Sequence, residues 1–291
     1  MKLVIAATPD VALPTIQSLQ KTHQVTVVTQ PDRPAGRGKQ LKATEVALAY
    51  PNALKPESEA ELQEVLKGSD LLITIGYGRI LKPETLALPA HGGINLHFSL
   101  LPKWRGAAPV QRSIEAGDKR SGVTVFQMDA GMDTGPIWSQ IEYQIPYATT
   151  SPQLFEALSE IGVSAISNAI DLIANGSTPT AQSGEVSIAA KVKKEECRID
   201  WNASAEEILR KIRAFAFNPG VFSFIRGEQI KISEAQLAEG ILAPGEISAT
   251  GLVGTKDGAI QLINLTPAGK KAMPAKDWLN GFKPQQGERF E

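Results

Sequence analysis

The stretch KLVIAATPDVALPTIQSLQKTHQVTVV, residues 2–28, joins two apolar runs through a helical pattern. Leu3 to Ala7 is continuously apolar and Val25 to Val28 is apolar except for Thr26, which is typical of strands buried in a parallel sheet. From Val11 to Leu19 apolar residues recur at helical spacing, and Pro14 is tolerated because it falls in the first turn. This strand–helix–strand order predicts the first unit of a doubly wound sheet.

The same alternation of strand and helix signals continues to about residue 145. Further apolar runs predict strands at Leu71 to Ile75, Ile94 to Leu96, Val123 to Met128 and Ile137 to Ile145. We therefore predict an α/β fold with a doubly wound, mostly parallel, Rossmann-like sheet. The first strand-to-helix turn lacks the G-x-G-x-x-G pattern, so the sequence does not indicate a dinucleotide site.

A long helix is predicted over Ser151 to Asn175. Ser151 can cap this helix, Pro152 suits its first turn, and Gly176 suits its end. The residues that follow, Ser177 to Ala190, are rich in Ser, Thr, Ala and Gly and have little periodicity. This composition is typical of a linker between domains.

The last third of the chain has a different pattern. Ser204-Ala205-Glu206-Glu207 is typical of a capping box at the start of an amphipathic helix. Short apolar runs broken by Gly and Pro then predict strands at Val221 to Ile225, Gln229 to Ile232, Gly245 to Ile247, Leu252 to Thr255 and Ile260 to Leu265. Such a series favours a small barrel or sandwich, and we predict an OB-like β-barrel. The predicted organisation is a first domain at 1–175, a linker at 176–197 and a second domain at 198–291.

The composition is that of an ordinary globular protein. Of the 291 residues, 42% are hydrophobic, and the formal net charge is −1. Balanced charge argues against a chain that coats nucleic acid non-specifically, although local basic patches remain open. A single cysteine, Cys197, excludes an internal disulfide and fits a reducing compartment. With no signal-peptide pattern and no apolar run of about 18 residues, we expect a cytoplasmic protein outside the membrane.

Asn95 and His97 lie two residues apart at the end of a predicted strand. Their side chains should therefore share one face, at the sheet edge where ligands bind in open α/β folds. The chain contains three histidines, His23, His91 and His97, and His97 has the most suggestive position. From the residues alone, His97 is equally well explained as a functional group or as a buried histidine bonded to a backbone carbonyl.

Two aspartates, Asp129 and Asp133, occur in the turn-rich segment MDAGMDTGPI, residues 128–137. Small, turn-forming residues around a carboxylate suggest a tight loop that presents it. From the residues alone, either aspartate is better explained as an ordinary turn residue.

Several motifs together resemble the formyltetrahydrofolate-dependent formyltransferase family. They are NLHFSLLPKWRGAAP at 95–109, GVT at 122–124 and MDTGPI at 132–137. Within that family, TQPDRPAGRGK at 29–39 resembles the substrate-binding loop of members that act on a charged tRNA. The segments at 194–201, 212–215 and 267–271 resemble parts of the second domain of the same family. The resemblance covers nearly the whole chain.

The resemblance implies a catalytic trio of Asn95, His97 and Asp133. Attack on a formyl carbon builds an oxyanion, and the amide of Asn95 is the expected donor to it. His97 is expected to carry protons and support the oxyanion, while Asp133 orients and charges it. Neither a covalent intermediate nor a metal is expected.

The resemblance also implies the substrates. N10-formyltetrahydrofolate is the expected co-substrate, and the α-amine of methionine on initiator tRNA is the expected acceptor, which places the activity in translation initiation. The folate pocket is expected to include Ser99, Leu100, Leu101 and Pro102. The tRNA is expected to meet the second domain and a basic loop that carries Arg33, Arg37, Lys39 and Lys42. We expect a monomer.

Three alternatives remain open from the sequence. The acceptor could be a small amine, such as a glycinamide nucleotide or an amino sugar, although such an acceptor needs neither a second domain nor a basic loop. The enzyme could be a hydrolase that releases formate from the same folate. The chain could also be a non-catalytic module that binds folate or RNA.

Overall fold

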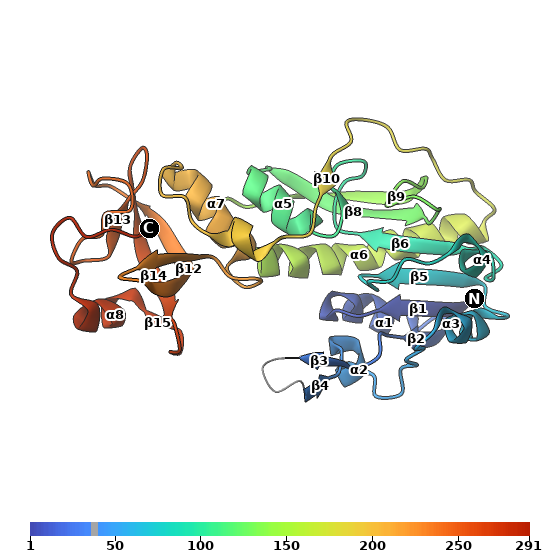
Figure 1. Cartoon of the computed structure of the whole chain (residues 1–291). Helices are drawn as coiled ribbons and strands as arrows, with labels where there is room; N and C mark the ends of the chain where they lie inside the picture. The colour runs from blue at the N-terminus through green and yellow to red at the C-terminus, as the bar shows by residue number, and fades with distance from the viewer. Residues whose placement is uncertain (36–39) are drawn as a thin grey trace. The chain divides into compact units, whose positions relative to one another are not determined.

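The computed structural model describes residues 1–35 and 40–291 (Figure 1). The described chain divides into two compact units. The first unit comprises Met1–Pro109, Arg120–Gln144 and Phe155–Ala189. The second unit comprises Val110–Lys119, Ile145–Leu154 and Ala190–Glu291.

The first unit is built on one mixed sheet with the strand order β2-β1-β5-β6-β8-β9. Its strands are β1 (Lys2–Ala7), β2 (Gln24–Val28), β5 (Leu71–Ile75), β6 (Gly93–His97), β8 (Arg120–Gln127) and β9 (Ile137–Gln144). Three neighbouring pairs in this order are parallel: β2 with β1, β1 with β5, and β5 with β6. Strand β8 pairs antiparallel with both β6 and β9. The predicted α/β fold with a Rossmann-like sheet is confirmed.

The buried strands match their sequence pattern. Every residue of β5 is buried, which explains why all of its residues except Thr74 are apolar. In β9, by contrast, the last residues alternate between exposed and half-buried, as expected for an antiparallel edge strand with one side open. The short connection between β8 and β9 reverses the direction of the chain, so the two strands run antiparallel.

Helices and short elements complete the first unit. They are η1 (Asp10–Ala12), α1 (Leu13–Leu19), α2 (Glu45–Ala49), α3 (Glu59–Leu66), α4 (Pro83–Leu86), and the short strands β3 (Arg33–Ala35), β4 (Gln40–Lys42), β7 (Arg105–Gly106) and β10 (Ile188–Ala189). Pro14 lies in the first turn of α1, as predicted. Thr44 and Ser58 cap α2 and α3 by accepting a backbone N–H with their hydroxyl oxygens.

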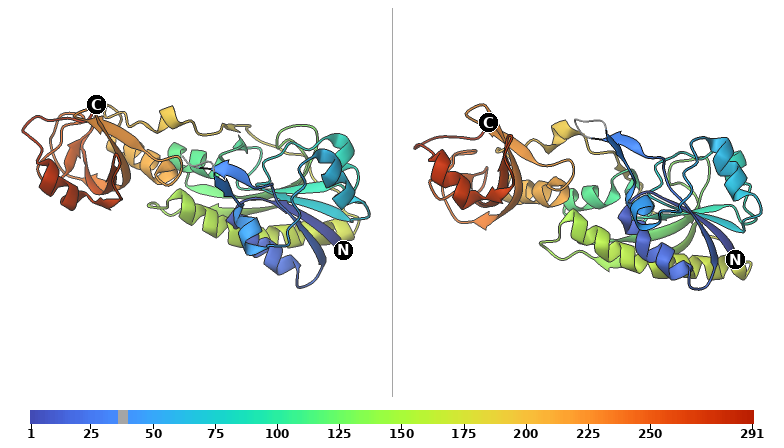
Figure 2. Two further views of the ribbon diagram at one scale, coloured as in Figure 1. Left: turned by 60° about the horizontal axis from the view of Figure 1, so that its bottom comes forward. Right: turned by 90° about the horizontal axis from the view of Figure 1, so that it is seen from below.

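The long helix α6 (Ser151–Ala174) runs along the sheet in both views of Figure 2. By length and composition α6 could cross a membrane, although the sequence showed no unbroken apolar run of that length. Its packing is that of a core helix: a Cβ added at Gly162 would lie 2.8 Å from a methyl of Leu96 in β6. The hydroxyl of Ser159 also donates to the carbonyl of Val11.

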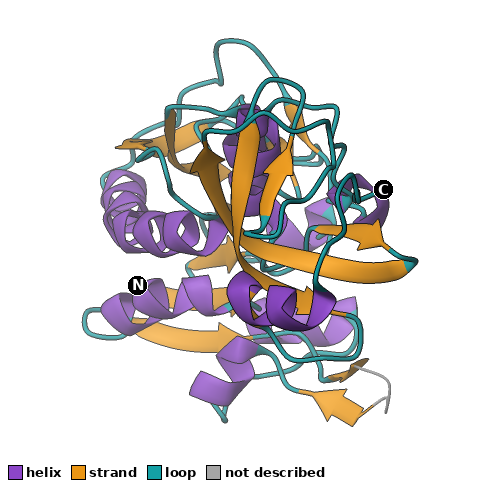
Figure 3. Cartoon of the chain, turned by 90° about the vertical axis from the view of Figure 1, so that its left-hand side faces the viewer, coloured by secondary structure: helices purple, strands orange, loops and turns teal. Residues whose placement is uncertain are grey.

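The second unit contains a curled antiparallel sheet that forms a half-barrel (Figure 3). Its elements are α5 (Pro109–Ala116, of which Pro109 belongs to the first unit), η2 (Lys194–Cys197), α7 (Ala205–Phe215), β11 (Phe222–Ile225), β12 (Glu228–Ala238), β13 (Leu252–Gly254), β14 (Ala259–Pro267), β15 (Met273–Pro274) and α8 (Ala275–Phe282). The predicted capping box of Ser204 and Glu207 at the start of α7 is confirmed.

Two strand predictions in this unit were wrong in detail. The predicted strand at Gly245 to Ile247 is a set of isolated bridges, because Glu246 and Ile247 pair with different segments. The strand predicted at Gln229 to Ile232 is the beginning of the much longer β12. Beyond Ile232 its residues are mostly polar or half-exposed, so they lack the apolar run by which a buried strand is recognised.

Candidate active site

Asn95 and His97 lie on the same face of β6, close to its carboxyl end. In the register of the sheet, Asn95 is opposite Thr74 of β5 and Phe126 of β8, and His97 is opposite Thr124 of β8. Residues that are opposite one another share a face, so these side chains form one polar and aromatic surface.

Both ring nitrogens of His97 have a defined neighbour. Nε2 lies 2.9 Å from the carbonyl oxygen of Trp104, and Nδ1 lies 3.7 Å from Oδ2 of Asp133. A carbonyl oxygen only accepts hydrogen bonds, so Nε2 carries the proton and donates it to Trp104. Nδ1 is therefore the nitrogen that gains or loses a proton, and it faces the carboxylate.

Two opposing effects set the pKa of His97. Its side chain is 6% exposed, and this burial lowers the pKa because the charged imidazolium loses hydration. The negative charge of Asp133 and the bond to Trp104 raise the pKa, but burial is the larger effect. His97 is therefore a neutral base near pH 7, next to a carboxylate that stabilises its protonated form.

The loop between β8 and β9 presents Asp133. This residue has a φ of 56°, in the left-handed region that few non-glycine residues adopt. Its Oδ2 accepts a hydrogen bond of 2.7 Å from the backbone N–H of Gly106. The carboxylate therefore lies between a backbone donor and the His97 ring.

The structure distinguishes between the two aspartates of this loop. Oδ1 of Asp129 accepts hydrogen bonds from the backbone N–H of Gly131 and from the hydroxyl of Thr134. Asp129 thus closes its own turn, whereas Asp133 faces His97.

The sequence did not reveal the partner of Asn95. The hydroxyl of Thr74, which is 4% exposed, donates a 2.8 Å hydrogen bond to Oδ1 of Asn95. With Oδ1 engaged, the two hydrogens of Nδ2 are oriented away from Thr74 and can serve as donors. Thr74 is the polar residue of β5, next to the carboxyl end of that strand, and this position was the only sequence signal for its role.

The segment Ser99 to Pro102, predicted to contact folate, forms a tight turn after β6. The hydroxyl of Ser99 donates to the carbonyl of Lys103 at 2.6 Å, and Ser99 is 1% exposed. The hydroxyl of Thr124 bridges the turn, donating to the carbonyl of Ser99 and accepting the N–H of Leu101. Leu100 is half-exposed, whereas Ser99, Leu101 and Pro102 are buried. The Ser99 side chain is thus occupied in shaping the turn.

The basic loop is only partly described. Arg33 and Lys42 are opposite one another in the antiparallel pair of β3 and β4. Arg33 donates to the side-chain oxygen of Gln30, and Lys42 pairs with Glu45 at 3.3 Å. Arg37 and Lys39 lie outside the described residues. The described part is thus a hairpin that carries a cation at the base of each arm.

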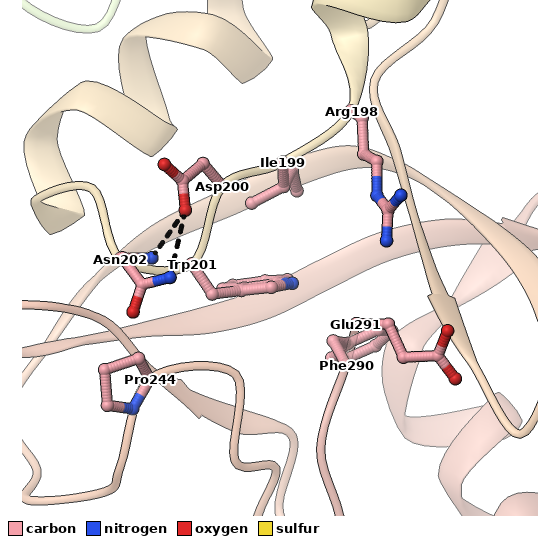
Figure 4. A pocket seen from close by; sticks show the side chains of 8 residues that line it. All are labelled: Arg198, Ile199, Asp200, Trp201, Asn202, Pro244, Phe290 and Glu291. Atoms are coloured by element: carbon pink, nitrogen blue, oxygen red, sulfur yellow. Dashed lines mark hydrogen bonds between the residues drawn. The ribbon is translucent and has the colours of Figure 1, made fainter.

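In the second unit, a cavity of about 430 Å³ lies beside Trp201 and Phe290 (Figure 4). These two rings stack with their centroids 5.2 Å apart. The residues that line the cavity are Arg198, Ile199, Asp200, Trp201, Asn202, Pro244, Phe290 and Glu291. The predicted catalytic residues are not among them, so this cavity is separate from the candidate active site.

The comparisons with known proteins concern both units. The family described as "Formyl transferase" matches residues 1–170, and "Formyl transferase, C-terminal domain" matches residues 191–283. The chain is similar to the methionyl-tRNA formyltransferase of Thermodesulfovibrio yellowstonii, with 38% identity over 98% of this chain and 97% of that protein. The enzyme of the same name from Magnetococcus marinus is 39% identical over 99% of this chain and 98% of its own.

Solved structures share the fold. A methionyl-tRNA formyltransferase from Clostridium thermocellum aligns with a TM-score of 0.62 and 20% identity, over 82% of this chain and 94% of its own. HypX from Aquifex aeolicus in complex with tetrahydrofolic acid aligns with a TM-score of 0.73 and 20% identity, over all of this chain and 50% of its own.

Proposed function

Because this chain belongs to the formyl transferase family, we propose that it transfers the formyl group of N10-formyltetrahydrofolate to the α-amine of methionine on initiator tRNA. The observation that carries this proposal is the similarity, across both units, to enzymes named methionyl-tRNA formyltransferase. The product would be the formylated methionyl-tRNA used in translation initiation.

In the proposed reaction, the neutral amine attacks the formyl carbon. The bond from the amine nitrogen to that carbon forms, and the bond from the carbon to N10 of the folate breaks. The hydrogens of Asn95 Nδ2, which the bond from Thr74 directs away from β5, stabilise the oxyanion of the tetrahedral intermediate. The amine loses one proton and N10 gains one, so the overall proton balance is zero.

His97 and Asp133 are proposed to carry that proton. Nδ1 of His97 is the open nitrogen, and the carboxylate at 3.7 Å stabilises the imidazolium that forms during the transfer. This separation exceeds a hydrogen bond, and such contacts commonly tighten only when substrates are bound. In this proposal, side chains supply both the oxyanion donor and the proton carrier.

The remaining parts have proposed roles in binding. Residues 1–175 would form the catalytic domain and 198–291 the tRNA-binding domain. Residues 176–197 would join them, with the part up to Ala189 packed in the first unit. The turn Ser99 to Pro102 would border the folate, through its backbone and Leu100 rather than the hydroxyl of Ser99. The cations Arg33, Arg37, Lys39 and Lys42 would meet the acceptor end of the tRNA. We propose that the enzyme acts as a cytoplasmic monomer without membrane attachment.

The proposed function is tested by incubating the protein with N10-formyltetrahydrofolate and methionyl-tRNA and detecting formyl-methionine by mass spectrometry. Parallel reactions contain a nucleotide-linked amino sugar, a glycinamide nucleotide, or no amine. Formylation of methionyl-tRNA alone is expected. Formylation of a small amine, release of formate without an acceptor, or binding without turnover would each overturn the proposal in favour of the corresponding alternative.

A further inference from the structure

Residues 175–189, which follow α6, lie against the loop that carries Asp133 and against strand β9 beside that loop. Thr180 and Ile137 exchange two backbone hydrogen bonds, of 2.7 and 2.8 Å. Further along, β10 pairs with β7, and the hydroxyl of Ser187 accepts the N–H of Trp104. Although its composition is that of a linker, this segment is therefore a part of the first unit.

The side chain of Gln182, in this segment, contacts the Asp133 loop. Its Nε2 donates to two backbone carbonyls of the loop, that of Asp133 at 2.9 Å and that of Gly135 at 2.8 Å. Its Oε1 accepts from the guanidinium of Arg105, from Nη2 at 2.7 Å and from Nε at 3.2 Å. The amide thus satisfies both carbonyls and the guanidinium at once.

These bonds close a ring around the carboxylate of Asp133. Gly106, which donates its N–H to Oδ2 of Asp133, directly follows Arg105. Gln182 therefore holds the loop that carries the carboxylate and, through Arg105, the strand that binds the carboxylate. A residue with a φ of 56° depends on such outside contacts to keep its conformation.

We infer that Gln182 is a positioning residue that fixes the carboxylate of Asp133 relative to Nδ1 of His97. This inference rests on the proposed catalytic role of that pair. Gln182 does not act on the substrate itself. A displacement of about 1 Å at a reacting group can cost about 10²-fold in rate, so a fixed loop has a large effect on turnover.

The test replaces Gln182 with methionine, which has a similar length and no charge but neither donates nor accepts these bonds. Gln261 offers a matched control. It is also half-buried, and its Nε2 also donates to two backbone carbonyls, those of Thr250 and Leu262, in the second unit. Gln261→Met therefore removes an equivalent pair of bonds away from the Asp133 loop.

Two measurements are made on each variant. The first is kcat and KM for formylation, and Gln182→Met is expected to lower kcat by about 10- to 100-fold while each KM stays within about threefold. The second is the titration of the His97 ring by NMR, without substrate. Asp133 is the charged group facing His97 from the β8–β9 loop, while Trp104 contributes a carbonyl and Phe126 of β8 an uncharged ring. A displaced Asp133 should move the His97 midpoint to lower pH.

The inference holds if Gln182→Met shows both effects and Gln261→Met shows neither. It is overturned if kcat falls without movement of the His97 midpoint, if the midpoint moves without loss of kcat although Asp133→Ala is impaired, or if Gln261→Met behaves in the same way. The NMR titration needs no turnover. If Gln182→Met moves the His97 midpoint but Asp133→Ala remains fully active, the catalytic proposal is refuted. The contact of Gln182 with the Asp133 loop would still stand.

Discussion

Nδ1 of His97 lies 3.7 Å from Oδ2 of Asp133, and the opposite nitrogen of the same ring is held by the carbonyl of Trp104. The ring is thus fixed at one end and open to protonation at the other. Because both side chains are largely buried, the charge on Asp133 acts on His97 with little screening by water. The predictions below follow from this arrangement and from the contacts around it.

The hydroxyl of Thr74 should matter through the orientation of Asn95. Thr74→Val keeps the shape of the side chain but removes the 2.8 Å bond to Oδ1. We expect kcat to fall about tenfold with little change in either KM, because part of the oxyanion stabilisation is lost. Thr74→Ser, which keeps the hydroxyl, should restore most of kcat. Equal activities of the Val and Ser variants would contradict this role.

The His97 ring should titrate below its ordinary pKa of 6.5, because its burial outweighs the charge of Asp133. Asp133→Asn removes the negative charge that raises the pKa, so the midpoint should move to still lower pH. NMR is the appropriate measurement, because the substrate amine also titrates near neutral pH and obscures the kinetic profile.

Asp129→Asn is the matched control for this titration. Asp129 bonds to its own turn, so its substitution should leave the His97 midpoint unchanged. A midpoint that moves equally in the two variants would show that Asp133 has no special influence on the ring.

Gly135 should be indispensable to the Asp133 loop. A Cβ at this position would overlap the backbone oxygen of Gln127, so the loop would have to move. We expect Gly135→Ala to cost about 1–3 kcal/mol in the free energy of unfolding and to lower kcat as well. Within the described chain, a Cβ at Gly258 meets no heavy atom within 4 Å. Gly258→Ala should therefore leave stability and kcat nearly unchanged in denaturation and formylation assays.

The proposed tRNA contact of the basic loop predicts a salt effect. If Arg37 binds a phosphate, Arg37→Ala should raise the KM for methionyl-tRNA or lower kcat, and should weaken the dependence of tRNA binding on salt concentration. The KM for folate should stay the same. Unchanged kinetics and unchanged salt dependence in this variant would remove the loop from the tRNA-binding surface.

The sequence predicted those features that depend on local patterns. Apolar runs located the strands of the first sheet, and the two-residue spacing placed Asn95 and His97 on one face. The choice between Asp129 and Asp133 depends on which loop residues reach His97, and this contact is not local. Gln182 was missed for a related reason: its segment has a linker composition, and its bonds to Asp133 and Arg105 arise only in the folded chain. The length of β12 was missed because its polar half lacks an apolar signal.

The most direct test of the catalytic trio is the single-turnover rate of formyl-methionyl-tRNA formation by Asn95→Ala, His97→Ala and Asp133→Ala, with unfolding measured alongside. Each variant should remain folded and lose about 10²- to 10³-fold in rate, the usual effect of removing one such group from a preorganised site. A folded variant of any of the three residues that formylates methionyl-tRNA at nearly the wild-type rate would contradict the role proposed for that residue.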